Sequence, residues 1–398
     1  MEMVETLESK YLLLKTGRKA GENSNVWDGV YQGKAVTLVE EDYGSVLEQY
    51  IVEDYVLRCL GQASTVAKDK HFSIRDPYAC SLETFLKVKK ENCDIHLPNV
   101  LKKADLLSAG WETNGYRHTP FPVKILRDVV QACYELRVNR LEHGDLTAKN
   151  VVLCVSKERI RAKVMRLKRG TTNDYADYQS LPKLVEDLFS SPKDETGYSY
   201  MSHEANDLWL HVQQMTVPNS NVDQREWREH QEISQENFLQ DPRTLFKEPI
   251  FWSDDKCLQF FVRVRKVLQK CHKSQSYKTP QIQHFLSDIQ AISQTDWFME
   301  LQDGNVAAVR AQLYDGAYAM YDGNKTEDLL SFIRNMLSHF EEKANDFKVA
   351  IGDIPHGFFE FFRSRYPNLL LETRRVLKIH LKTLQGYADV TDTFEEYI

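Results

Sequence analysis

The hydrophobic pattern of the N-terminal part alternates with a period of two residues. The stretches KYLLLK (10–15) and NVWDGVYQGKAVTLVEED (25–42) are rich in β-branched and aromatic residues, which predicts paired strands. The apolar run at 151–153 predicts another strand. Apolar residues at helical spacing predict three helices, over 47–60, 120–138 and 174–189.

In the last part of the chain, apolar residues recur at helical spacing over 254–269, 280–292 and 329–340. For the last of these helices we expect an N-cap at Thr326, with acidic residues in its first turn. Its buried stripe is expected to consist of Leu329, Phe332, Ile333, Met336, Leu337 and Phe340. Arg334, Asn335 and His339 must then share the neighbouring polar face, because residues three or four apart lie side by side on a helix.

The composition indicates a globular protein, because 42% of its 398 residues are hydrophobic and 27% are charged. The net charge of −7 excludes neither RNA nor protein partners, since a local basic patch is sufficient to bind nucleic acid. No apolar run approaches the roughly 20 residues that span a bilayer, so we expect no membrane association. The seven cysteines are scattered without a C-x-x-C pair, and neither a disulfide framework nor a metal site is expected. These features favour the cytoplasm, with the nucleus as the alternative.

The stretch LEHGDLTAKNVVLCV (141–155) resembles the catalytic loop of protein kinases, which reads H-R-D-L-x-x-x-x-N. In kinases the Asp accepts the substrate proton and the Asn binds magnesium, and these positions are occupied here by Asp145 and Asn150. With this loop as reference, the helix over 47–60 corresponds to the kinase helix that supplies a glutamate. Glu53 is the candidate for that residue.

Three parts that phosphoryl transfer requires are missing from this arrangement. The stretch GRKAGENSNVWDG lacks the G-x-G-x-x-G spacing of the phosphate-covering loop. The strand that should read V-A-I-K ends in Leu38, so no lysine can pair with Glu53. The D-F-G position is Lys168-Arg169-Gly170, which puts a cation where a carboxylate binds magnesium. We therefore predict a pseudokinase in which Asp145 and Asn150 are structural, with ATP or ADP binding left as an open alternative.

The polar face with Arg334, Asn335 and His339 has chemistry suited to RNA cleavage without metal. Such cleavage needs a base for the 2′-hydroxyl, an acid for the leaving 5′-oxygen and cations on the phosphate. Histidine titrates near neutrality and arginine is a forked phosphate donor. By spacing alone, a solvated helix face is the simpler interpretation.

Two stretches of the sequence favour the ribonuclease interpretation over the solvated helix face. DLLSFIRNMLSHFEE and GDIPHGFFEFFRSRYPNLLLETRRVLK resemble the KEN domain of the Ire and RNase L ribonucleases. The resemblance implies an α+β chain with a bilobal protein-kinase-like domain (1–252) followed by an all-α KEN ribonuclease domain (253–398). It also implies that Arg334 and Asn335 bind the scissile phosphate, that His339 is the general acid, and that Tyr321 assists the 2′-hydroxyl. The stretch DYQSLPKLVEDLF, directly after the D-F-G position, resembles the truncated activation segment of RNase L more than that of the Ire enzymes.

The same resemblance implies an RNA substrate and a homodimer. We expect a basic RNA-binding surface, with ordinary solvated charge as the alternative, made of Arg363, Arg365, Arg374, Arg375, Lys378 and Lys382. Neither the oligoadenylate-binding ankyrin repeats of RNase L nor the lumenal sensor and membrane helix of Ire is expected in this chain.

The leading hypothesis is a metal-independent endoribonuclease that leaves a 2′,3′-cyclic phosphate, needs no cofactor, and uses its degenerate kinase domain for dimerisation and regulation. The alternative is a catalytically inactive scaffold that regulates a related ribonuclease by heterodimerisation. An active protein kinase ranks third.

Overall fold

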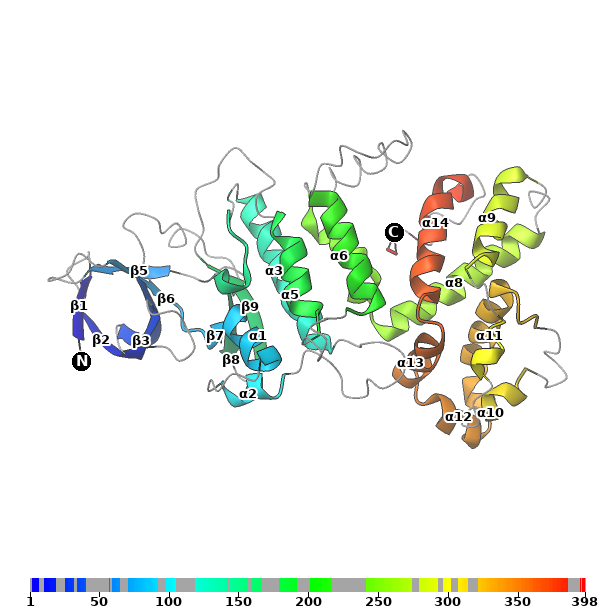
Figure 1. Ribbon diagram of the computed structural model, residues 1–398, viewed down its shortest axis with the longest axis horizontal. Coiled ribbons are helices and arrows are strands. Elements are labelled where there is room, and N and C mark those ends of the chain that lie inside the picture. Colours follow the sequence, from blue (N-terminus) through cyan, green and yellow to red (C-terminus); the bar gives the residue numbers. More distant parts are fainter. Residues whose placement is uncertain are drawn as a thin grey trace. The chain divides into compact units, whose positions relative to one another are not determined.

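The structure, a computed structural model, divides into two compact units, the first ending at Leu245 and the second beginning at Phe246 (Figure 1). It describes residues 2–6, 11–18, 26–31, 34–40, 57, 59–64, 71–91, 97–104, 119–139, 141, 143–156, 159–165, 179–191, 201–216, 241–273, 279–292, 296–301, 307–313, 321–385, 394 and 396–397. No helix among these residues combines the length and the apolar character that a membrane span requires.

Six antiparallel strands at the start of the first unit form a closed barrel (Figure 1). The strands predicted over 10–15 and 25–42 are confirmed. The predicted helix over 47–60 is wrong at its end, because Cys59 and Leu60 belong to a strand, while Glu53 lies outside the described residues. In barrel order the strands are β1 (Glu2–Thr6), β2 (Tyr11–Arg18), β3 (Val26–Tyr31), β4 (Lys34–Glu40), β6 (His71–Arg75) and β5 (Cys59–Ser64).

The remainder of the first unit is mainly helical around a three-stranded sheet (Figure 1). The predicted helix over 120–138 is confirmed with these bounds, and Pro120 occupies its first turn, where a missing N–H costs nothing. The sheet has the order β7 (Cys80–Ser81), β8 (Val151–Ser156) and β9 (Arg159–Val164). The helices are α1 (Leu82–Glu91), α2 (Asn99–Lys102), α3 (Pro120–Val138), η2 (Ala148–Asn150), α5 (Leu181–Phe189) and α6 (His203–Thr216).

A small core joins the barrel to this second lobe. The Leu57 N–H donates to the Val164 carbonyl oxygen at 2.8 Å, and Leu57 is fully buried. The core residues are Val26 and Val39 of the barrel with Leu57, Tyr78, Val152 and Met165. The first unit is therefore a bilobal, kinase-like α+β fold.

The described residues of the second unit form only helices and turns (Figure 1). One continuous core rich in phenylalanine holds them together, with Phe260, Phe285 and Phe332 fully buried. The short helix η3 (Pro242–Lys247) spans the boundary between the units, and η4 (Pro249–Phe251) follows it. The helices that follow are α8 (Asp254–Lys273), α9 (Pro280–Gln290), η6 (Met299–Leu301), α10 (Ala307–Ala311), α11 (Thr326–Ser338), η8 (Phe340–Glu342), α12 (Asn345–Ile351), α13 (His356–Arg365) and α14 (Leu369–Gln385).

The start of α11 differs from the prediction by one residue. Lys325 occupies the N-cap position, and Thr326 is the first helical residue. Thr326 is fully buried, and its hydroxyl turns to the Gln290 carbonyl oxygen at 3.5 Å instead of capping the helix. Burial against α9 has therefore overridden the local capping preference.

Candidate active site

The predicted polar face of α11 contains a chain of hydrogen bonds. The Asn335 amide donates from Nδ2 to the Tyr321 hydroxyl at 2.8 Å. The Arg334 guanidinium donates from Nη1 to Asn335 Oδ1, also at 2.8 Å. All three side chains are half-buried, because Phe332 and Met336 of the same helix face the core. The structure thus brings together three of the four predicted catalytic residues.

Tyr321 lies in a tight turn that a buried tryptophan holds in place. The Trp297 indole nitrogen donates to the Asp322 and Lys325 carbonyl oxygens, both at 3.1 Å. The Trp297 backbone N–H donates to the Gly323 carbonyl oxygen at 2.9 Å. Trp297 is 1% exposed, so these bonds are protected from water and position the turn firmly. The residues that Trp297 holds lie one, two and four positions after Tyr321, so the core of the unit places Tyr321.

His339 stands just outside α11, as its C-cap residue. Its backbone N–H donates to the Asn335 carbonyl oxygen at 3.1 Å, which places it one helical turn beyond Asn335. The imidazole Nδ1 lies 3.0 Å from Glu342 Oε2, and the side chain is 35% exposed. A carboxylate at this nitrogen orients the ring. His339 is thus accessible from solvent.

Arg265 of α8 is a cation near this site that the sequence did not reveal. Burial lowers the pKa of its guanidinium, the nearby carboxylates of Glu327 and Asp328 raise it, and Arg334 lowers it. Its Nη1 is buried and has no hydrogen-bond partner among the described residues. A buried donor without a partner costs stability, which makes Arg265 a candidate for a functional role. The packing of α8 against α11 creates this neighbourhood, and local sequence spacing contains no signal for it.

Comparison with known proteins finds similar sequences for both units. Residues 257–391 match the family described as Ribonuclease 2-5A. The chain is 28% identical over 140 residues to the serine/threonine-protein kinase/endoribonuclease IRE1 of Oryza sativa subsp. japonica (35% of this chain, 14% of the relative). It is 30% identical over 130 residues to the human kinase/endoribonuclease IRE2 (33% and 13%). It is also 22% identical over 436 residues to IRE1b of Arabidopsis thaliana (90% and 45%).

The second unit is therefore similar to the Ribonuclease 2-5A family, and most of the chain is similar to an Ire-type kinase/endoribonuclease. On the basis of this similarity, we refer to the first unit as the kinase-like domain and to the second unit as the KEN domain. The matches span less than half the length of each of these three relatives. A closer relationship to RNase L than to the Ire enzymes stays a prediction.

The predicted basic surface of the KEN domain is wrong in one residue, Arg374. Arg374 is 6% exposed and donates through both terminal nitrogens to the Glu248 carboxylate, at 2.8 and 3.0 Å. Its Nε donates to the Tyr397 carbonyl oxygen at 2.9 Å. Helix α14 turns this arginine inward, where it connects the start of the KEN domain to its end, so it cannot contact RNA.

The other predicted arginines are less buried. Arg363 lies 3.3 Å from the Glu360 carboxylate, and Arg365 covers the Phe361 ring at 3.9 Å. Arg375 is the most open, with 68% of its side chain exposed and Glu372 at 3.6 Å. Lys378 is also exposed, and the Lys382 side chain lies outside the described residues. An RNA-binding role for these residues stays a prediction.

The catalytic-loop motif of the kinase-like domain is held by its own side chains. Asn150, 2% exposed, donates from Nδ2 to the Asp145 carbonyl oxygen at 2.9 Å and to its carboxylate at 3.0 Å. His143 Nε2 lies 2.6 Å from the Met165 carbonyl oxygen. These bonds fit the predicted structural role. At the position of the nucleotide-binding lysine, Leu38 is buried and apolar. The doubtful binding of ATP or ADP stays a prediction.

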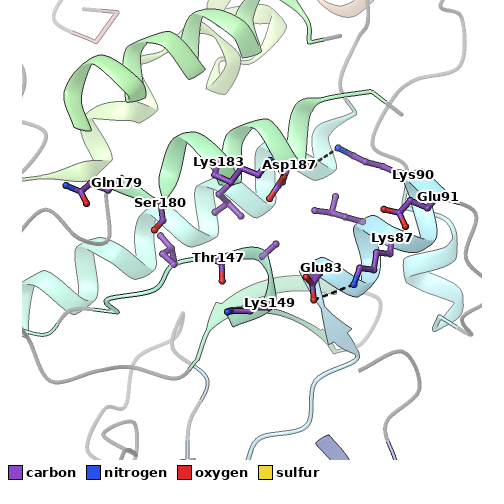
Figure 2. A pocket seen from close by; sticks show the side chains of 14 residues that line it. Glu83, Lys87, Lys90, Glu91, Thr147, Lys149, Gln179, Ser180, Lys183 and Asp187 are labelled. Carbon is purple, nitrogen blue, oxygen red and sulfur yellow. Dashed lines mark hydrogen bonds and ion pairs between the residues drawn. The ribbon is translucent and has the colours of Figure 1, made fainter. Parts of the chain in front are cut away.

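The kinase-like domain also contains a cavity of about 650 Å³ between α1, residues 146–149 and α5 (Figure 2). Lysines and acidic residues alternate around it, and neither Asp145 nor Asn150 lines it. Lys90 Nζ donates to the Asp187 carbonyl oxygen at 2.5 Å, and burial lowers the pKa of this lysine to about 8. The charged lining residues are Glu83, Lys87, Lys90, Glu91, Lys149, Lys183 and Asp187.

Proposed function

We propose that the KEN domain is an endoribonuclease that cleaves single-stranded RNA without a metal ion and leaves a 2′,3′-cyclic phosphate. The observation that supports this is the hydrogen-bonded chain Arg334–Asn335–Tyr321, one helical turn from the exposed His339. It combines phosphate donors, a hydroxyl and an imidazole, which are the groups that metal-free cleavage needs.

Each group has one role in this reaction. Arg334 and Asn335 hold the non-bridging oxygens of the scissile phosphate, which are most negative in the transition state. The Tyr321 hydroxyl orients the 2′-hydroxyl of the RNA, whose oxygen attacks phosphorus after losing its proton towards solvent. As the bond from phosphorus to the 5′-oxygen breaks, protonated His339 gives its proton to that oxygen. The products are a 2′,3′-cyclic phosphate and a free 5′-hydroxyl.

The kinase-like domain serves dimerisation and regulation in this proposal, and the active form is a homodimer. Leu38 and the locally bonded Asn150 support a pseudokinase, because they leave the phosphates of a nucleotide without the usual cation. Pairing two chains raises the effective concentration of the second nuclease face. RNA cleavage then requires neither ATP nor ADP. The cysteines that are free among the described residues fit a reducing compartment, and we propose the cytoplasm as the site of action.

Cleavage of a uridine-rich RNA by the purified full chain in EDTA tests this function. We expect cleavage by the wild type and a loss of about 10²- to 10⁴-fold in His339→Ala, the range for a lost general acid. His356→Ala is the matched control, because that imidazole also contacts a carboxylate, at 2.6 Å from Asp254. The 3′ ends of the products, resolved by mass spectrometry, should have the mass of a cyclic phosphate.

Three results would refute parts of the proposal. Intact RNA at high protein concentration would support the non-catalytic scaffold, and co-sedimentation with a related ribonuclease would then test that role. Activity that requires added metal would exclude the mechanism. Autophosphorylation with labelled ATP would overturn the pseudokinase assignment.

A further inference from the structure

Away from the candidate active site, two helices of the KEN domain bring three potential metal ligands together. His284 and Asp288 are four residues apart on α9, and His380 lies on α14. Asp288 Oδ2 is 2.6 Å from His380 Nε2, and Asp288 Oδ1 is 3.6 Å from His284 Nε2. One ligand atom from each side chain lies within 4.8 Å of the other two. Each imidazole therefore points its Nε2 atom at the Asp288 carboxylate.

The surroundings of this group are those of a built site. His380 is 5% exposed, and its ring packs against Phe285 with the ring centres 5.6 Å apart. The His284 and His380 rings meet edge to face at 5.2 Å. The His284 side chain is 71% exposed, which leaves a path for an ion from solvent. One ligand is thus fixed in the core while another is open to water.

We propose that His284, Asp288 and His380 bind a zinc ion that links α9 to α14. Two imidazole nitrogens and one carboxylate oxygen are a common zinc ligand set, with water in the fourth position. At zinc–ligand distances of about 2.1 Å, tetrahedral ligand atoms stand roughly 3.4 Å apart. The observed separations of 2.6 and 3.6 Å are measured to the two different oxygens of Asp288, and one ligand atom of each side chain lies within 4.8 Å of the others. Rotation of the three side chains would therefore have to bring these atoms to the tetrahedral spacing.

The other histidine–carboxylate contacts of the described KEN domain show what distinguishes this group. His272 with Glu327 and His356 with Asp254 each place a single imidazole 2.6 Å from a single carboxylate, and His339 lies 3.0 Å from Glu342. A site with only two ligands would hold zinc weakly. A ligand set of imidazole and carboxylate favours zinc over magnesium. Among the residues that the structure describes, only the α9–α14 group places three such ligands together. None of these three residues belongs to the proposed RNA-cleaving site, so the two proposals are tested separately.

Zinc titration of the metal-free full chain, in competition with a chromophoric chelator, tests this proposal. We expect one ion per chain in the wild type and an affinity about 100-fold or more lower in His284→Ala, because one of the three ligands is lost. His284 is largely exposed, so this variant should keep its fold. His356→Ala is the matched control and should bind zinc as the wild type does. Cobalt substitution should give the visible absorption of a tetrahedral site.

A second measurement distinguishes zinc bound by this group from zinc bound elsewhere, for example by cysteine. Zinc should raise the thermal unfolding midpoint of the wild type and of His356→Ala, but not that of His284→Ala or Asp288→Asn. Equal zinc affinity in the wild type and His284→Ala would overturn the proposal. So would a wild type that fails to compete with the chelator, which would leave these residues as a hydrogen-bonded link between the helices.

Discussion

The buried ion pair between Arg374 and Glu248 leads to the sharpest prediction about stability. The two side chains are 8% and 4% exposed and share two hydrogen bonds, at 2.8 and 3.0 Å. In Arg374→Met the Glu248 carboxylate stays buried without its cation, and the Tyr397 carbonyl oxygen loses a donor. Breaking a buried pair from one side costs about 3–5 kcal/mol. That is a large part of the roughly 5–15 kcal/mol that a domain has in total.

The matched control for this substitution is the next residue in the chain. Arg375 is 68% exposed and lies 3.6 Å from Glu372, so Arg375→Met should change the free energy of unfolding by less than about 1 kcal/mol. Urea denaturation of the full chain measures the loss. Hydrogen exchange in peptides from 369–385 assigns the transition to the KEN domain. A double variant with Glu248→Gln should recover a substantial part of the loss, because no unpaired charge remains.

The reasoning fails if Arg374→Met and Arg375→Met destabilise the chain equally. It also fails if Arg374→Met keeps its stability but weakens RNA binding with a reduced salt dependence. That result would mean that the arginine contacts phosphate after all.

The remaining predictions concern single side chains. Arg265→Met should lower cleavage about tenfold or more. The free energy of unfolding should stay unchanged or rise, because a buried donor without a partner is removed. A loss of stability with normal cleavage would contradict this prediction. Gly323→Ala should lower the free energy of unfolding by about 1–3 kcal/mol in urea denaturation and should also lower cleavage. The reason is that the added Cβ would stand 1.8 Å from Asp296 Oδ1. Unchanged stability would contradict the turn geometry. Lys90, with its pKa lowered to about 8, should be about half unprotonated at pH 8, against under about 1% for an ordinary lysine. Amine-reactive labelling mapped by mass spectrometry should thus favour Lys90 over the more exposed Lys87, and equal labelling would argue against the lowered pKa.

Local pattern in the sequence determined where several of the helices and strands lie. Helix α3 has the predicted bounds 120–138, and α8, α9 and α11 begin within a few residues of their predicted starts. Helical periodicity and turn chemistry act over a few residues, so the sequence contains them directly. The placement of Arg334 and Asn335 on one partly exposed face follows from the same periodicity.

Contacts between distant segments decided the remaining features. The sequence does not distinguish Arg374, which is buried, from Arg375, which is exposed, because the difference depends on Glu248, 126 residues away. Likewise, His380 meets Asp288 across 92 residues. A charged residue on an amphipathic helix is ordinarily solvated, and only the packing of another element over it creates a buried pair or a set of ligands. Helix positions were therefore determined locally, whereas the partners of the polar side chains were decided by tertiary packing.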